Sequence, residues 1–382
     1  MVDFAAHNEE VKKIWEEYGA GTNARPPMVL GVNVRFTMLD RSLNETGVNF
    51  REYSENPDVM FEEQARFDRF RRMNIVYDAE MGVPENGWQV GVDFQNYYEA
   101  AWFGAPVIYP EGNVPFGEPF LTDGNKNMLF WQGIPETMSG LLKKGRDYYE
   151  YFQEKARAFE FEGVKVGKVN PSFCGTDGPF TVACNIRGAS EFCLDLYEDP
   201  GYAHVLLDFI TEATIRRIRE WRRYLGQPEK TDGFGFADDS ILLLSKRDYM
   251  EHVLPYHKRL AAELSNGLLT NSIHLCGDAT RHFKMLRDQM NVYSFDTGFP
   301  VDHRALSQEL GSDVAIYGGP HVELLRSGME SQVREEVRRI LNAVDGLSKK
   351  FVLREGNNLA PCTPLRNIEA MYDECGKFRY ST

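Results

Sequence analysis

The segment LLTNSIHLCG, residues 268–277, holds the pattern that decides the fold of the whole chain. Its β-rich part, Leu268–Ile273, has the length and composition of a buried strand and leads into the polar end His274-Leu275-Cys276-Gly277. Apolar residues at helical spacing follow over Ala279–Met290. A strand that ends in polar residues and leads into a helix is the repeating unit of a parallel α/β fold.

The same unit recurs on both sides of this segment. Further strand-like runs, each followed by polar or glycine residues, are Met28–Val34, Gln89–Asp93, Val164–Val169, Gly233–Ala237, Val292–Phe295, Val314–Tyr317 and Phe351–Leu353. Helical patterns in the second half lie at Tyr249–Leu264, His303–Leu310 and Val322–Val344. About eight such units fit the chain length better than an open sheet of five or six strands. The sequence therefore predicts an α/β fold, a single (β/α)8 TIM barrel.

The first part of the chain differs from this pattern. We expect residues 1–80 to form a helical, aromatic-rich N-terminal extension that packs on a barrel spanning residues 81–382. No Gly-x-Gly-x-x-Gly fingerprint opens the first helix, which weakens a dinucleotide-binding alternative. The aromatic residues of the first half are interpreted either as core and loop residues or as a wall for a flat substrate. They include Trp88, Tyr97, Tyr98, Trp102, Phe103 and Trp131.

The composition and charge of the chain limit the cell compartments and the kinds of partner that are expected. The 382-residue chain has a formal net charge of -14, which argues against nucleic acid or an anionic membrane surface as the main partner. Its six cysteines lack the density and short spacing of a secreted disulfide scaffold, so a reducing compartment is expected. No signal-peptide pattern opens the chain, and no apolar run is long enough to span a membrane. We therefore expect a cytoplasmic enzyme that acts on a small molecule.

The polar end of the quoted segment is the strongest candidate site. Residues i and i+2 of a strand point to the same side, so His274 and Cys276 would project together. An imidazole and a thiolate on one face are natural zinc ligands, although a core histidine beside a small buried cysteine has the same pattern. A catalytic zinc needs a third protein ligand, and the candidates are Cys362 and Glu355 after the last predicted strand.

Carboxylates at other strand ends are candidates for acid–base or positioning roles. Asp238 and Asp239 follow one strand, and one of the two is expected to cap the following helix, which leaves the other free. Asp296 occupies the equivalent place two strands later. These three are predicted as catalytic. Residues predicted to bind substrate are Arg35, Asp93, Asp177 and His321.

Five motifs follow one another along the chain: Gly178-Pro-Phe-Thr181, Ala237-Asp-Asp-Ser240, Leu254-Pro-Tyr-His-Lys258, His274-Leu-Cys-Gly277 and Leu359-Ala-Pro-Cys-Thr-Pro-Leu-Arg-Asn-Ile-Glu-Ala-Met371. Taken in this order, they resemble the uroporphyrinogen decarboxylase superfamily over residues 85–378. The decarboxylases of this superfamily carry an arginine-rich segment after the first strand, whereas Leu30–Met38 here offers only Arg35.

The His-x-Cys strand is similar to that of the corrinoid-linked methyltransferases of this superfamily, which hold zinc with it and a later cysteine. In thiol-activating members that cysteine lies about where Asn357 stands, whereas Cys362 falls inside the Ala-Pro-x-Thr-Pro stretch. The resemblance implies transfer of a methyl group between a small methylated substrate (a methoxy compound, amine or thiol) and a corrinoid protein, so that cobalamin is carried by a partner. Alternatives are a metal-free decarboxylase or lyase and a non-catalytic binding protein. The oligomeric state, a homodimer among the options, is left open.

Overall fold

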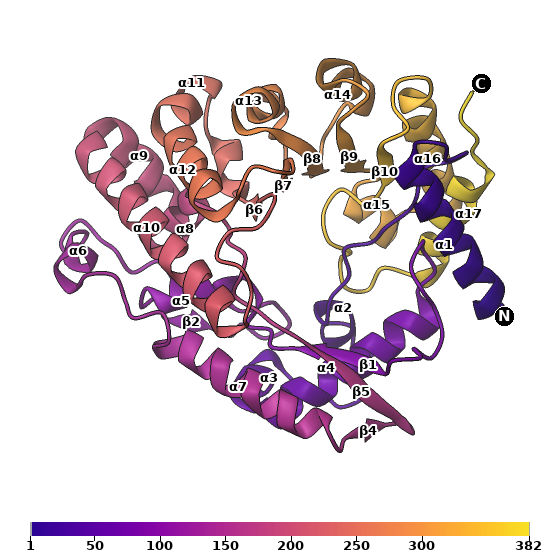
Figure 1. Ribbon diagram of the computed structural model, residues 1–382, viewed down its shortest axis with the longest axis horizontal. Coiled ribbons are helices and arrows are strands. Elements are labelled where there is room, and N and C mark those ends of the chain that lie inside the picture. The colour runs from indigo at the N-terminus through magenta and orange to yellow at the C-terminus, as the bar shows by residue number, and fades with distance from the viewer. Residues whose placement is uncertain (1, 382) are drawn as a thin grey trace.

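The computed structural model describes residues 2–381, and its centre is a sheet of five parallel strands in the order β10-β9-β8-β7-β6 (Figure 1). Helices follow these strands on the outside, as the alternating pattern predicts. The strands are β6 (Gly235–Ala237), β7 (Asn271–Leu275), β8 (Val292–Thr297), β9 (Ala315–Gly318) and β10 (Phe351–Leu353). The helices of this half are α11 (Lys246–Asp248), α12 (Leu254–Leu264), α13 (Thr280–Met290), α14 (His303–Leu310), α15 (Val322–Ser327), α16 (Glu330–Val344) and α17 (Leu365–Lys377).

One helix prediction in this half is wrong. The pattern over Val322–Val344 forms two helices, α15 and α16, because Gly328 takes an extended conformation between them. The second helix then starts afresh, with the side chain of Gln332 accepting a hydrogen bond from the backbone N–H of Met329 at 2.9 Å.

A second group of strands lies below the main sheet in Figure 1. In it β1 (Trp88–Gly91) pairs in parallel with β5 (Val164–Asn170), and β4 (Glu160–Phe161) pairs antiparallel with β5. The remaining elements are the two-stranded sheet β2 (Val107–Ile108) and β3 (Phe116–Gly117), and helices α1 (Phe4–Ala20), α2 (Arg35–Met38), α3 (Phe50–Glu55), α4 (Pro57–Asn74), α5 (Tyr98–Trp102), α6 (Met128–Gln132), α7 (Gly140–Ala156), α8 (Pro179–Arg187), α9 (Ala189–Glu198) and α10 (Pro200–Tyr224), with helical turns at Gln95–Tyr97, Asp239–Leu243 and Tyr249–Val253.

Two short contacts extend the main sheet at its two edges. Met28 bridges Leu353 in parallel at the β10 edge, and the backbone N–H of Ala237 at the β6 edge donates to the carbonyl of Thr176 at 3.1 Å. Met28, β1, β5 and β6–β10 thus supply eight strand positions in chain order. No continuous ladder joins the two sheets within residues 2–381, so closure of the barrel stays a prediction.

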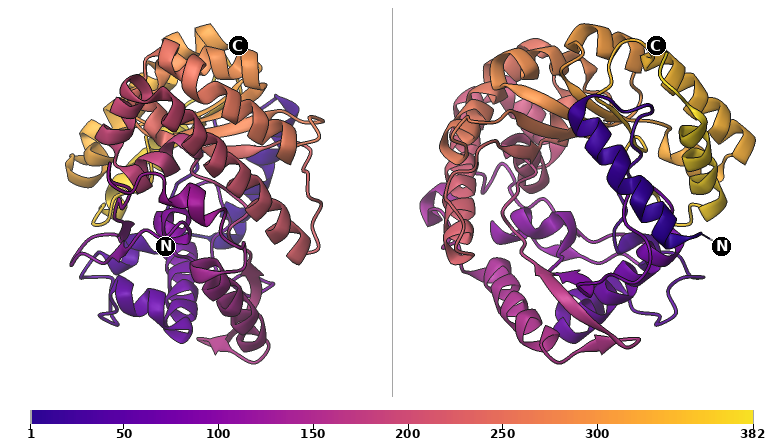
Figure 2. Two further views of the ribbon diagram at one scale, coloured as in Figure 1. Left: turned by 90° about the vertical axis from the view of Figure 1, so that its left-hand side faces the viewer. Right: turned by 45° about the vertical axis from the view of Figure 1, so that its right-hand side comes forward.

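The first barrel position therefore falls inside the segment 1–80, and the division of the chain at residue 80 stays a prediction. Helix α1 runs beside the C-terminal helices (Figure 2, right), where the hydroxyl of Tyr18 donates to the carbonyl of Lys350 at 3.1 Å. The aromatic residues of the first half favour the core interpretation, because Trp88, Trp102 and Phe103 are buried whereas Trp131 is 80% exposed. No helix within residues 2–381 has the length and apolar character needed to cross a membrane.

Side chains of the main sheet point alternately to its two faces, and several polar ones lie on the inner face. Ile273 and Phe295 are buried at 2% and 0% exposure, whereas the half-buried Ser272, His274 and Asp296 point to the opposite, inner face of the sheet. The inner face is thus polar at positions that barrels of this class fill with branched apolar residues.

Candidate functional site

The site is built where the strands of the main sheet end. Strand pairing sets Ala237, His274 and Asp296 side by side on β6, β7 and β8. The two ring nitrogens of His274 have different partners: Nδ1 lies 2.6 Å from Asp296 Oδ2, and Nε2 lies 3.2 Å from Cys276 Sγ. The imidazole and the sulfur thus face each other, as the spacing of two residues on one strand predicts.

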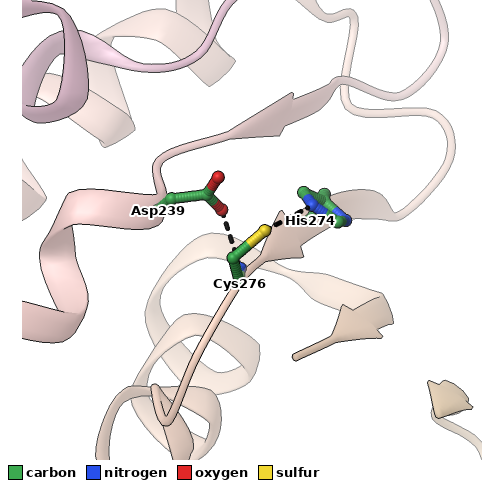
Figure 3. Close-up of side chains that lie close together, drawn as sticks. All are labelled: Asp239, His274 and Cys276. Carbon is green, nitrogen blue, oxygen red and sulfur yellow. Dashed lines mark hydrogen bonds between the residues drawn. The ribbon is translucent and has the colours of Figure 1, made fainter. Parts of the chain in front are cut away.

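An acidic side chain, that of Asp239, is the third member of this cluster (Figure 3). Asp239 follows β6, and its Oδ1 accepts a hydrogen bond from the backbone N–H of Cys276 at 2.7 Å. One ligand atom from each of Asp239, His274 and Cys276 lies within 4.8 Å of the other two, and within residues 2–381 no other group of His, Cys, Asp or Glu meets this criterion. Nitrogen, sulfur and carboxylate oxygen together fit zinc.

The surroundings of the cluster also fit a zinc site. Asp296 holds Nδ1 of His274, which fixes the ring orientation and leaves Nε2 for a metal, and Arg354 donates to the same carboxylate. Burial lowers the pKa of His274, so the neutral imidazole needed for ligation is favoured. Burial raises the pKa of the Cys276 thiol in the absence of a metal. A bound cation would offset this shift, because it stabilises the thiolate.

Neither of the two residues predicted as third ligand lies in the cluster. Cys362 is exposed, has a left-handed φ of 62°, and lies at the rim of a cavity that opens beside the cluster. Glu355 is fully buried, and its Oε1 accepts from the backbone N–H of Gly31 at 2.7 Å. The structure instead brings Asp239, predicted as a catalytic residue, close to His274 and Cys276.

Glu355 gives a prediction on the pH dependence of stability. Burial raises its pKa to about 7, above the value of an unfolded glutamate, so its contribution to folding is full at low pH and is lost as the pH rises through 7. We expect the free energy of unfolding, measured by urea titration, to fall between pH 5 and pH 8 by roughly 1–3 kcal/mol more in the wild type than in Glu355→Gln. Parallel pH profiles for the two proteins would contradict the assignment, since the amide still accepts the Gly31 hydrogen bond.

The structure gives Asp238 a role different from the predicted catalytic one. Its fully buried carboxylate accepts hydrogen bonds from the backbone N–H groups of Phe180 and Thr181, at 3.1 and 2.7 Å, and from the Thr181 hydroxyl at 2.6 Å. His257 Nε2 lies 2.8 Å from the same carboxylate. Asp238 therefore caps the N-terminus of α8, while its neighbour Asp239 remains free to face the cluster.

A cavity of about 890 Å³ opens over the cluster. Asp177 lines it, and burial and then the neighbouring Glu99 carboxylate raise the pKa of Asp177 to about 8. The loop that carries Asp177 is held from below by a buried ion pair, in which Arg217 Nη2 lies 2.5 Å from Glu99 Oε1. The other Glu99 oxygen accepts from the backbone N–H of Asp177 at 2.7 Å. The predicted substrate-binding residue Asp177 thus faces the same space as His274.

Of the other three residues predicted to bind substrate, only one lines this cavity. Arg35 lines the 890 Å³ cavity, where its Nη2 donates to Asn96 at 2.9 Å. Asp93 lies in a neighbouring pocket, where it accepts hydrogen bonds from Gln95 and Tyr53. His321 does not line the cavity: its Nδ1 caps α15, and the centroid of its ring lies 4.2 Å from the ring centroid of Phe299.

Comparison with known proteins identifies the family. The profile described as uroporphyrinogen decarboxylase (URO-D) matches residues 150–378, more than half of the chain. The chain belongs to the URO-D family. A solved structure of a methyltransferase from Methanosarcina mazei superposes with a TM-score of 0.66 at 18% identity, covering 96% of this chain and 98% of that one.

Curated members similar to this chain fall into two groups. It is 29% identical to a methylated-thiol–coenzyme M methyltransferase of Methanosarcina mazei over 52% of this chain, a match that spans 50% of that relative's length. It is 22% identical to a methylcobamide:CoM methyltransferase of Methanosarcina acetivorans over 58% of this chain and 63% of the relative. A uroporphyrinogen decarboxylase of Prochlorococcus marinus is 21% identical over 95% of this chain and 96% of its own length.

Four residues of this URO-D family site were not predicted from the sequence: Arg354, Asn357, Glu99 and Arg217. Arg354 and Asn357 lie in the loop after β10. Position after a strand end pointed to the other site residues, so it could have pointed to these two as well. Asn357 Oδ1 lies 3.2 Å from Cys276 Sγ. No local pattern could have found the Glu99–Arg217 pair, because its members are far apart in the chain and meet only in the fold.

Proposed function

We propose that this URO-D family member is a zinc-dependent methyltransferase that moves a methyl group between a small methylated substrate and a corrinoid carried by a partner protein. The observation that carries the proposal is the cluster of Asp239, His274 and Cys276 next to a cavity of about 890 Å³. The similarity to relatives named as methylthiol and methylcobamide methyltransferases supports the same chemistry. A cytoplasmic location and a homodimer stay predictions.

His274, Cys276 and Asp239 would hold the zinc ion, and the cavity beside them leaves space for a substrate atom. When bound, zinc supplies Lewis-acid chemistry that stabilises negative charge on the substrate heteroatom. Asp296 fixes the ring of His274, and Arg354 in turn holds Asp296. These contacts keep the donor set in place during turnover.

Transfer toward the corrinoid breaks the bond between the methyl carbon and its heteroatom, and the heteroatom keeps the electron pair. A reduced corrinoid on the partner protein would supply the electron pair for the new bond to the methyl carbon. The heteroatom then needs a proton, and Asp177 would deliver it, because its carboxyl lines the cavity and its raised pKa of about 8 favours the protonated form at neutral pH. In the reverse direction the same carboxylate would accept that proton.

A direct assay tests the proposal. The purified, zinc-loaded protein is expected to convert free cob(I)alamin to methylcob(III)alamin with at least one donor among dimethyl sulfide, 2-methoxyphenol and methylamine, followed by the change in cobalamin absorption. Removing zinc with a chelator should abolish the reaction and adding zinc back should restore it. Full activity of the metal-free protein, or no methyl transfer together with release of carbon dioxide from a carboxylated substrate, would contradict the proposal.

The alternative, a decarboxylase acting on a porphyrinogen, is supported by relatives matched over nearly the full chain. The charges of the cavity argue against it. Three arginines line this space, and two of them are already engaged: Arg354 with Asp296 and Arg326 with Glu323. Arg35 alone is left for a substrate with several carboxylates, which would stay poorly neutralised.

A further inference from the structure

A second cavity, of about 510 Å³, lies against the inner face of the main sheet. It meets the 890 Å³ cavity at four residues that line both: Asp177, Ala237, His274 and Arg354. The imidazole of His274 is thus reached from two sides. We call the larger space the outer cavity and the smaller one the inner cavity.

The inner cavity exists because one row of inward-facing positions carries very small side chains. Strand pairing aligns Gly235, Ser272 and Ser294 with one another, and each lies two residues before the row of Ala237, His274 and Asp296. At about 3.3 Å per residue, the row of small side chains lies about 7 Å deeper toward the strand starts. Barrels of this class fill such rows with valine, isoleucine or leucine, so the small residues leave space directly beneath the cluster.

The lining of the inner cavity is polar but balanced in charge. Ser272, Ser294 and Tyr317 line the cavity, and within residues 2–381 their hydroxyl groups have no hydrogen-bond partner in the protein, so a ligand could bind to them. Arg354, the cation of this lining, is engaged with Asp296. A ligand that carried a net charge would therefore find no free counterion in this lining, whereas an uncharged polar group would find several hydrogen-bonding partners.

Transfer of a methyl group also constrains where the two reactants bind. Displacement at carbon requires the donor heteroatom and the incoming atom to lie on opposite sides of the methyl group, aligned with it. Two cavities that meet at His274 provide such an arrangement, whereas a single open cavity would bring both reactants from one side. The outer cavity is the larger of the two and fits the bulkier reactant.

We infer that the inner cavity binds the non-reacting part of the methylated substrate, and that this part is a compact, uncharged group with hydrogen-bonding atoms, such as an amide or an alcohol. This inference rests on the proposed methyl transfer for the role of the ligand. Ser272, Ser294 and Tyr317 would hold the group by their hydroxyls, and the methyl end would lie next to His274.

Two probes of the same shape but different charge test the inference: 2-methoxyacetamide, which is neutral, and methoxyacetate, which is an anion. Calorimetric titration of the zinc-loaded protein is expected to show at least about tenfold tighter binding of the amide. Ser272→Ile and Ser294→Ile fill the cavity and should each weaken amide binding at least about fivefold. Ser312→Ile is the matched control, because Ser312 is exposed, lies outside the lining and should bind the amide as the wild type does.

Ser294→Ala keeps the test valid if an isoleucine variant does not fold, because it removes the hydroxyl without adding volume. Its affinity for the amide is expected to fall about twofold to fivefold. Equal affinity for the two probes, or unchanged amide binding in all three cavity variants, overturns the inference. The proposed function fails separately. If the protein transfers methyl groups to cob(I)alamin but shows no preference for the amide, the proposed function holds and the inner-cavity site is wrong. If it prefers the amide but transfers no methyl group, the site holds and the proposed function is wrong.

Discussion

Replacing His274 with alanine is expected to remove zinc from the purified protein and to lower methyl transfer by at least about a thousandfold. The imidazole faces both Cys276 and Asp296, so its loss deletes one of the three donors of the cluster and also the group that Asp296 orients. Elemental analysis of the dialysed wild type and variant measures the metal directly. Equal zinc content in the two proteins would remove the metal site from the proposal.

The matched control for this experiment is a pair of cysteine variants. Cys276→Ser replaces a sulfur inside the cluster and should lose zinc as His274→Ala does. Cys362→Ser replaces an exposed sulfur at the cavity rim and should keep both zinc and activity. Loss of zinc in Cys362→Ser would show instead that the rim closes over the site and that Cys362 is the third ligand.

Replacing Asp238 with alanine is expected to lower the free energy of unfolding by about 3–5 kcal/mol. The carboxylate is fully buried and receives hydrogen bonds from two backbone N–H groups and a hydroxyl of α8, and His257 is also in contact with it. Removing it leaves these groups without an acceptor. Urea denaturation followed by circular dichroism provides the measurement.

Asp239→Ala is the control for this prediction, because it changes the adjacent residue. Asp239 accepts one backbone hydrogen bond and faces the cavity, so its loss should cost less than about 1 kcal/mol of stability while lowering zinc content. A stable but inactive Asp238→Ala protein would restore the predicted catalytic role of Asp238 and contradict the capping role described above.

The adjacent aspartates also show where sequence reasoning reached its limit. The sequence predicted that one of Asp238 and Asp239 caps a helix, but it pointed to the helix that follows. The structure assigns the cap to Asp238 and to α8, which precedes it by more than fifty residues in the chain. A Cβ on Gly178 would lie 2.4 Å from the carbonyl of Ala237, so the glycine before α8 permits this close approach.

The third ligand shows the same limit. Position after a strand predicted Cys362 and Glu355 as well as it did Asp239, because all three follow strand ends. Their distances from His274 depend on how far each loop extends and which way each side chain points, and these are set by long-range packing. Glu355 turns to Gly31 and Cys362 stays at the rim, so only Asp239 reaches the cluster.

The residue pattern alone determined the α/β alternation, the strand ends as the place of the site, and the pairing of His274 with Cys276, because each depends on a local period of two or on neighbouring units. Tertiary structure alone decided that Asp239 faces this pair, that Arg354 and Asp296 support it, and that a row of small residues opens a second space beneath it. Those features join segments that are distant in the chain, and their contacts are fixed only when the strands pair in register and the core packs.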